Sequence, residues 1–136
     1  MRVFLDANVL FSAAKSDGAV RQLLMLPEKS GHECCVDSYV IEEARRNLVA
    51  KAPDRVIALD RLLSRMKTAD VQRTDAALEA ALPLPAKDRP VLAAAINQGC
   101  TALVTGDRTH FGALYGRTIH GVAIHSPRSL AEALLW

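Results

Sequence analysis

Two aspartates that directly follow uncharged or nearly uncharged segments are the first residues whose types and spacing indicate chemistry. Asp6 follows the segment Arg2–Leu5, which has the composition of a β-strand. Asp107 follows Thr101–Thr105, an uncharged segment typical of a buried parallel strand. Ligands of open α/β sheets gather beyond the carboxyl ends of the strands, near the point where the strand order reverses. We therefore expect both carboxylates at one edge of a sheet.

Acids in the first turns of two expected helices extend this pair. Asp88 stands at the start of a helix that begins at Arg89 or Pro90. Glu42 or Glu43 lies early in a helix that begins after Asp37 or Ser38 and runs to about residue 51. The first turns of crossover helices lie closest to the same sheet edge, so four acids from separated segments can converge on one pocket.

Such a cluster of carboxylates indicates a divalent cation. Neighbouring carboxylates repel one another, and each is costly to desolvate unless a cation balances its charge. Ligand sets made only of oxygen favour Mg²⁺ or Mn²⁺, and the His and Cys residues show no spacing typical of a zinc site. A metal-bound water can be deprotonated to attack a phosphodiester. The pattern therefore predicts metal-dependent phosphoryl transfer or hydrolysis.

Each acid taken alone also has an ordinary structural explanation. An Asp at the end of a strand is more often a helix N-cap or a turn former than a ligand, and Asp88 would cap the helix of Pro90 in the same way. Glu42 and Glu43 would by default lie on a solvated helix face. A turn needs one such acid and not four, so the combination favours a functional site.

The segments around these acids alternate between strand and helix. We expect strands at residues 2–5, 33–36, 69–71, 101–105 and 121–124. We expect helices at about 9–15, 20–26, 38–51, 53–66, 75–82, 89–98 and from 127 onward, with a short one after Asp107. Strands separated by helices imply crossover connections. The predicted fold is α/β, a three-layer α/β/α sandwich with a mostly parallel five-stranded sheet.

Composition sets the broad class of the protein. The length of 136 residues fits one domain, residues 1–136, and 50% hydrophobic with 24% charged residues excludes a disordered or fibrous chain. A net charge of +2 permits a polyanionic partner without requiring one. The apolar runs are too short to cross a bilayer, and Asp6 interrupts any secretory segment. Three cysteines do not make a disulfide framework, so we expect a cytoplasmic protein without a membrane association.

Four segments in this order resemble the PIN domain, a family that includes the toxin ribonucleases of VapBC toxin–antitoxin pairs. They are Leu5–Leu10, Ser38–Leu48, Asp88–Ala95 and Leu103–Asp107. No single segment is specific, but their order is, and the resemblance runs from Met1 to about Ile124. It implies a PIN-like, Rossmann-like fold.

The resemblance also implies a set of catalytic and metal-binding acids: Asp6, Glu43, Asp88 and Asp107. Glu43 fits the family's Glu-x-Arg-Arg pattern better than Glu42, because the residues that follow then fall in register. Asn8 resembles the polar residue that supports the first acid, and Thr105 the hydroxyl residue that orients the loop of the fourth. In the family these acids bind Mg²⁺ or Mn²⁺ and activate a water that cuts single-stranded RNA.

The basic residues lead to two expectations. Lys87, Arg89 and Arg108 flank the predicted metal site, so we expect them to bind the substrate phosphates. A longer row on two successive helices is as typical of a solvated face as of a phosphate track. Its members are Arg45, Arg46, Lys51, Arg55, Arg61 and Arg65. The aromatic residues, 4% of the chain, are too few for a base-stacking platform, so we expect them to pack in the core. His110 is close to Asp107, which would allow it to contact the substrate, but an exposed loop histidine without a role is the commoner case.

The leading hypothesis is therefore a Mg²⁺- or Mn²⁺-dependent endoribonuclease that cleaves single-stranded RNA phosphodiesters. It is either the toxin component of a type II, VapBC-like pair or a stand-alone enzyme, and its expected partners are single-stranded or structured RNA, an antitoxin protein and a second copy of the chain. The alternative is a catalytically weak or inactive PIN-fold module that binds RNA or a protein. A phosphoaspartate domain is disfavoured, because Asn8 stands where a phosphatase of that type needs an acid.

Overall fold

The fold is built on one mixed sheet. The computed structural model describes residues 1–29, 31–70 and 75–135. The strands are β1 (Arg2–Leu5), β2 (Glu33–Asp37), β3 (Lys67–Ala69), β4 (Ala102–Val104), β5 (Thr118–Ile119) and β6 (Val122–His125). Their order across the sheet is β3-β2-β1-β4-β6-β5, and each neighbouring pair is parallel except β5 with β6. The expected α/β class with a mostly parallel sheet is confirmed.

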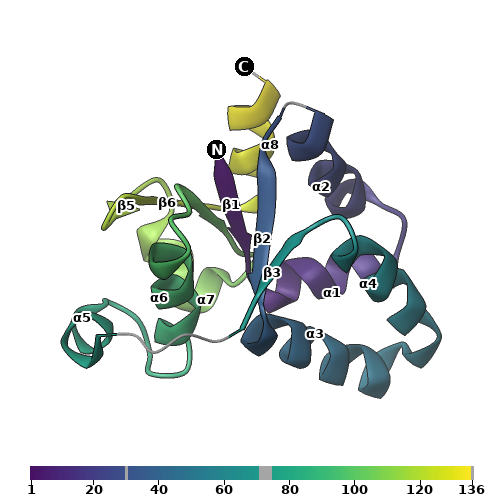
Figure 1. Ribbon diagram of the computed structural model, residues 1–136, viewed down its shortest axis with the longest axis horizontal. Helices are drawn as coiled ribbons and strands as arrows, with labels where there is room; N and C mark the ends of the chain where they lie inside the picture. The colour runs from purple at the N-terminus through teal and green to yellow at the C-terminus, as the bar shows by residue number, and fades with distance from the viewer. Residues whose placement is uncertain (30, 71–74, 136) are drawn as a thin grey trace.

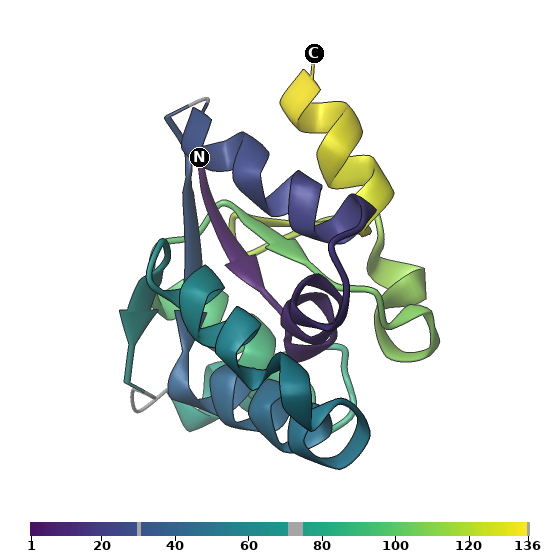
Figure 2. The same ribbon diagram turned by 90° about the vertical axis from the view of Figure 1, so that its right-hand side faces the viewer.

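Helices cover both faces of this sheet. They are α1 (Ala7–Lys15), α2 (Ala19–Lys29), α3 (Ser38–Lys51), α4 (Val56–Leu63), α5 (Ala76–Ala81), α6 (Arg89–Asn97), α7 (Arg108–Phe111) and α8 (Pro127–Leu135). Single 3₁₀ turns lie at η1 (Pro53–Arg55) and η2 (Gly112–Leu114). Figure 1 shows the sheet nearly edge-on, with α6 on its left and α1, α2, α3 and α4 on its right. Figure 2 looks onto these four helices, so the three-layer sandwich is also confirmed.

The expected number of five strands is wrong, because a sixth strand closes one edge. Thr118 pairs with Ala123 and Ile119 with Val122, which makes β5 and β6 a hairpin. Its two loop residues, His120 and Gly121, both have positive φ, 47° and 82°, as a type I′ turn requires. A strand of two residues carries no periodicity, and His is not a typical residue for this turn, so the sequence pattern gave no signal.

The third strand lies two residues earlier than expected. We placed it at 69–71, whereas Lys67 to Ala69 pair with Cys35 to Asp37 of β2, and Val71 lies outside the described residues. This strand is at the edge of the sheet and both Lys67 and Thr68 are exposed. Edge strands are often short and charged, so hydrophobic patterning does not locate them.

The two central strands, β1 and β4, determine where the site is. Val3, Phe4 and Leu5 of β1 are fully buried, as are Leu103 and Val104 of β4. The chain winds outward from β1 to one edge and from β4 to the other, so the strand order reverses between them. Leu5 and Val104 are neighbours in register, and the backbone N–H that follows Leu5 donates to the Val104 carbonyl at 3.1 Å. The segments that leave these strands therefore start side by side, where ligands usually bind in such sheets.

No helix among the described residues combines the length and the apolar composition needed to cross a membrane.

Candidate active site

The Asp6 carboxylate is held in place at the end of β1. One oxygen, Oδ1, accepts a hydrogen bond from the Ala7 N–H at 2.7 Å and caps α1. The other, Oδ2, accepts from Thr105 Oγ1 at 2.8 Å and from Asn8 Nδ2 at 3.3 Å. The side chain is only 6% exposed. The ordinary N-cap function and a place in the site are thus combined in one residue.

Thr105 and Asn8 connect the end of β1 to the loop that follows β4. Thr105 Oγ1 accepts from the Asp107 N–H at 3.1 Å, and Asn8 Oδ1 accepts from the Gly106 N–H at 2.8 Å. Asn8 Nδ2 also donates to Thr105 Oγ1 at 3.3 Å. Tyr115 adds a further bond from its hydroxyl to the Thr105 carbonyl at 2.7 Å. The loop that carries Asp107 is therefore fixed relative to Asp6.

We expect Thr105→Val to lower the free energy of unfolding by about 1–3 kcal/mol, because a fully buried hydroxyl that bonds both Asp6 and the Asp107 N–H is lost. Loss of the Thr105 hydrogen bond would also raise the pKa of Asp6 further. Urea denaturation measures the first effect. Thr105→Ser, which keeps the hydroxyl, is the matched control and should be closer to wild type than the Val variant. Equal stability of wild type and Thr105→Val would contradict this account of the network.

A second group of side chains gathers Asp88, Asp107 and His110. His110 Nδ1 lies 2.8 Å from Asp107 Oδ2 and 3.0 Å from Asp88 Oδ2. Asp107 Oδ1 accepts from the His110 N–H at 3.1 Å and caps α7. The side chain of Asp88, at the start of α6, makes no capping hydrogen bond, so the ordinary explanation for this residue fails. One ligand atom from each of the three residues lies within 4.8 Å of the other two.

One oxygen of Asp88 is left without a hydrogen bond. Asp88 Oδ2 is buried and has no hydrogen-bond partner among the described residues. His110 Nδ1 is close to it, but a ring nitrogen carries at most one hydrogen, and Asp107 Oδ2 is the nearer acceptor. A buried carboxylate oxygen without a donor is costly and calls for an explanation. A cation is one group that would satisfy it.

The charges in the site act on one another. Burial raises the pKa of Asp6, and the negative charges of Glu43 and Asp88 raise it further, while the hydrogen bonds from Thr105 and Ala7 lower it. Burial also raises the pKa of Asp88, and so does the charge of Asp107, against the lowering effects of His110 and Lys87. All four candidate acids therefore lie within electrostatic reach of at least one other. This crowding of negative charge is the arrangement that a cation would relieve.

Glu43 rather than Glu42 lies close enough to Asp6 and Tyr39 for its charge to act on both. Glu43 is partly buried and Glu42 is exposed. Burial raises the pKa of Tyr39, and the charges of Glu43, Asp88 and Asp6 raise it further, so three acids from separate elements surround this one phenol. The Tyr39 hydroxyl donates to the Lys87 carbonyl at 2.9 Å and so holds the turn before Asp88 against the start of α3.

Sequence reasoning missed three residues of this site: His110, Tyr39 and Tyr115. His110 contacts Asp107 and Asp88, and a signal for this existed, because a residue three positions after Asp107 in a helix lies on the same face. The tyrosines were expected to pack in the core, and both are instead half-buried with hydroxyls bonded to the carbonyls of Lys87 and Thr105. No pattern in the sequence indicates those two bonds, because each joins distant segments.

The three basic residues expected at the substrate differ in their surroundings. Lys87 and Arg108 are exposed beside the acids. Burial raises the pKa values of Asp88 and Tyr115, and the charges of Lys87 and Arg108 respectively oppose part of that effect. Arg89 is partly buried and donates through Nε to the Leu84 carbonyl at 2.9 Å. One of its donors thus stabilises the turn before α6.

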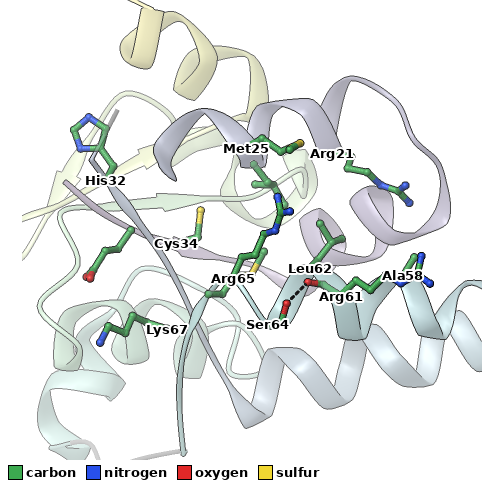
Figure 3. A pocket seen from close by; sticks show the side chains of 13 residues that line it. Arg21, Met25, His32, Cys34, Ala58, Arg61, Leu62, Ser64, Arg65 and Lys67 are labelled. Carbon is green, nitrogen blue, oxygen red and sulfur yellow. Dashed lines mark hydrogen bonds between the residues drawn. The ribbon is translucent and has the colours of Figure 1, made fainter. Parts of the chain in front are cut away.

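The longer row of cations does not form one continuous track. Arg45 forms an ion pair with Asp60 at 2.9 Å. Arg61 and Arg65 instead line an open cavity of about 770 Å³ between α2, α4 and the beginnings of β2 and β3, together with Lys67 and apolar side chains such as Met25. Figure 3 shows this cavity, which contains none of the four candidate acids. The row is therefore divided between separate surfaces.

Comparison with known proteins identifies the family. A family model described as PIN domain matches residues 2–109. The chain therefore belongs to the PIN-domain family, as the resemblance of its motifs indicated. No curated protein matches the sequence.

Solved structures show the same fold at low sequence identity. A chain of VapBC2 from Rickettsia felis bound to a promoter DNA fragment superposes with a TM-score of 0.70 at 19% identity, covering 93% of this chain and 98% of that one. A chain of DNA-bound VapBC from Salmonella typhimurium gives 0.66 at 18%, with the same coverage. VapC20 of Mycobacterium tuberculosis, described as a sarcin–ricin loop cleaving toxin, gives 0.57 at 15%, covering 87% and 97%. The α/β sandwich described above is thus a PIN fold of the type found in VapBC toxins.

The residues present fit a divalent cation. The candidate donors are the oxygens of Asp88 and Asp107 with the nitrogen of His110 nearby, and Asp88 Oδ2 is buried without a hydrogen bond. Carboxylate oxygens suit Mg²⁺ and Mn²⁺, and a ring nitrogen shifts the preference from Mg²⁺ toward Mn²⁺.

The raised pKa values predict a distinctive pH dependence of stability. The pKa values of Asp6 and Asp88 are raised in the folded protein. Such a carboxyl contributes its full stability at a pH below its pKa in the unfolded chain, about 3.9. This contribution is lost as the pH rises through the pKa in the folded protein. We therefore expect the Asp6→Asn/Asp88→Asn variant, measured in EDTA, to be more stable than wild type at pH about 7.5. This advantage should shrink at pH about 4, where the wild-type carboxyls become protonated. Urea denaturation at both pH values measures it, and an advantage that grew on acidification would contradict the assignment.

Proposed function

We propose that this protein is a metal-dependent endoribonuclease that cleaves phosphodiester bonds of single-stranded RNA. The observation that carries the proposal is the convergence of Asp88, Asp107 and His110, with a buried carboxylate oxygen of Asp88 that has no hydrogen bond. Membership of the PIN-domain family supports it, as does the fold shared with a structure described as a sarcin–ricin loop cleaving toxin.

In this proposal each side chain has a definite task. Asp6, Glu43, Asp88 and Asp107 would hold Mg²⁺ or Mn²⁺, while Thr105 and Asn8 keep Asp6 and the Asp107 loop in fixed positions. When bound, such a cation lowers the pKa of a coordinated water and offsets the charge of the reacting phosphate. The ammonium of Lys87 and the guanidinium of Arg108 bind the flanking phosphates, and Arg89 contributes the donors that Leu84 leaves free.

We further propose that the chain acts as the toxin component of a toxin–antitoxin pair. Two of the similar structures are VapBC complexes bound to DNA, which supports a protein antitoxin as partner. In the same proposal residues 1–136 form a single domain, two copies associate as a homodimer, and the protein works in the cytoplasm. A short neighbouring reading frame that encodes a DNA-binding protein, and its co-purification with this chain, would test the pairing.

A catalytically weak or inactive module that binds RNA or a protein is the second candidate, and one observation favours it. Burial raises the pKa of Asp88, and the positive charge of Lys87, which directly precedes it, partly opposes that effect. His110 Nδ1 also lies within 3.0 Å of the same oxygen, Oδ2. A cation such as the Lys87 ammonium, and a ring nitrogen that already occupies the carboxylate oxygen, both compete with a metal ion for it.

Cleavage of an end-labelled single-stranded RNA by the purified protein tests the proposal. We expect cleavage with Mg²⁺ or Mn²⁺, none in EDTA, and none by Asp6→Asn, whose amide oxygen can still cap α1. Asp54→Asn, which changes an exposed acid in the same way, should cleave like wild type. Cleavage that survives in EDTA or in Asp6→Asn would contradict the proposal, and RNA binding without any cleavage would favour the second candidate.

A further inference from the structure

One aromatic ring outside the candidate active site has two positive charges over it. Lys15 Nζ lies 5.7 Å, and Lys51 Nζ 5.6 Å, from the centroid of the Phe11 ring. Both lysines are exposed, and neither forms an ion pair with any residue that the structure describes. Phe11 is half-buried, with part of its surface packed against the core. The two ammonium groups lie over this ring, and part of the Phe11 side chain is exposed to solvent.

The common explanation for these lysines accounts for only part of the arrangement. Each stands in the last turn of its helix, where a positive charge interacts favourably with the helix dipole. This explains their positions along α1 and α3, but not why two like charges from different helices meet over one ring. A ring face stabilises a cation, yet two ammonium groups so placed also repel one another. An anion would relieve that repulsion.

The ring and the lysines belong to the two helices that begin at the acids: Phe11 and Lys15 to α1, and Lys51 to α3. Helices α1 and α3 pack against each other and run side by side, as Figure 1 shows with α1 above α3. Asp6 stands at the beginning of α1, and Glu43 lies in the first half of α3. At a rise of 1.5 Å per residue, Phe11 lies about 7.5 Å and Lys15 about 13.5 Å along α1 from Asp6. A short single-stranded RNA that passes the acids can therefore reach both Phe11 and Lys15.

We infer that Phe11, Lys15 and Lys51 form a nucleotide subsite for single-stranded RNA beside the acids. An aromatic face stacks on any base, and lysines on flexible stems bind phosphates, which is how sequence-tolerant single-strand sites are built. The ammonium groups move from the ring to the phosphates when a base takes the ring. The inference rests on the proposed function for its ligand, and it gives Phe11 a role in addition to its packing against the core.

Binding of a fluorescein-labelled single-stranded RNA of about 12 nucleotides tests the subsite. Fluorescence anisotropy is measured in EDTA, so that binding is read without cleavage. We expect the double variant Lys15→Gln/Lys51→Gln to weaken binding at least about tenfold at about 50 mM salt. The slope of log affinity against log salt concentration should fall in magnitude by about 1.4, because two phosphate contacts are lost. The exposed Lys67→Gln, at the edge strand β3, is the matched control and should reproduce the wild-type affinity and slope.

Substitutions of Phe11 separate stacking from packing. We expect Phe11→Leu to weaken binding by about 5- to 150-fold and Phe11→Trp to restore it, since stacking needs an aromatic face. Wild-type affinity and salt slope in both the double Lys variant and Phe11→Leu would overturn the subsite while leaving the proposed function intact. No binding by the wild-type protein would contradict both. Lysine-dependent binding by a protein that does not cleave would support the subsite and overturn the nuclease.

Discussion

Asp88→Asn is expected to reduce metal-dependent cleavage of single-stranded RNA by more than about 100-fold, while the melting temperature stays the same or rises. Loss of an outer-shell partner of a metal ligand typically costs about 10- to 100-fold, and removal of a direct ligand should cost more. The fold should tolerate the change because the Asp88 side chain does not cap α6 and its buried Oδ2 has no hydrogen bond to lose. The substitution also removes one negative charge from a crowded site, where burial and Asp107 already raise the pKa of Asp88.

Two measurements on the same preparations check this expectation. Initial cleavage rates in Mn²⁺ report the loss of activity, and a thermal melt in EDTA reports the stability of the fold. Asp54→Asn makes the same chemical change at an exposed acid and should alter neither. A variant Asp88→Asn that kept the wild-type rate would remove this residue from the catalytic set. A large fall in its melting temperature would show instead that Asp88 is structural.

Addition of Mn²⁺ to the metal-free protein is expected to raise its melting temperature substantially. A ligand that binds only the folded state at 100 times its Kd adds about 2.7 kcal/mol of stability. For a chain of this size that corresponds to a rise on the order of 10 °C. The physical reason is that the cation neutralises carboxylates that repel one another in the folded protein and are far apart in the unfolded chain.

The comparison of variants makes this test specific. The rise in melting temperature should be absent in EDTA. It should be much smaller in Asp88→Asn and in Asp6→Asn, because each of these variants lacks one candidate ligand. Asp54→Asn should show the full wild-type increment. An equal rise in melting temperature in all four proteins would indicate that Mn²⁺ binds elsewhere. No rise in the wild-type protein would favour the second candidate function, a catalytically inactive module that binds RNA or a protein.

Much of the architecture follows from the sequence alone. The segments Arg2–Leu5 and Thr101–Thr105 are uncharged or nearly so and are separated by helical patterns, so they had to become buried parallel strands. Each is followed by an aspartate, and the polarity of a parallel sheet sends both to one edge. The α/β class, the mostly parallel sheet and the meeting of Asp6 with the Asp107 loop were therefore predictable from local patterns.

Other features depended on contacts between distant segments. The hairpin of β5 and β6 is defined by its pairing and by two positive φ angles, neither of which has a periodic signal. Tyr39 and Tyr115 look like core residues until the carbonyls of Lys87 and Thr105 are placed beside their hydroxyls. The cations on α3 and α4 look like one row, yet Arg45 pairs with Asp60, and Arg61 lines a separate cavity.

One physical cause separates the features that the sequence predicts from those that it does not. Hydrophobic periodicity and turn residues act over a few neighbouring positions, so they determine which segments form strands and which acids end them. The distance between Asp88 Oδ2 and His110 Nδ1, 3.0 Å, and the lack of any hydrogen bond to that oxygen depend on how α6 and α7 pack around the ends of the central strands. Local patterns in the sequence therefore bring the acids to this edge, whereas the position of a histidine between two of them depends on the packing of segments that are far apart in the chain.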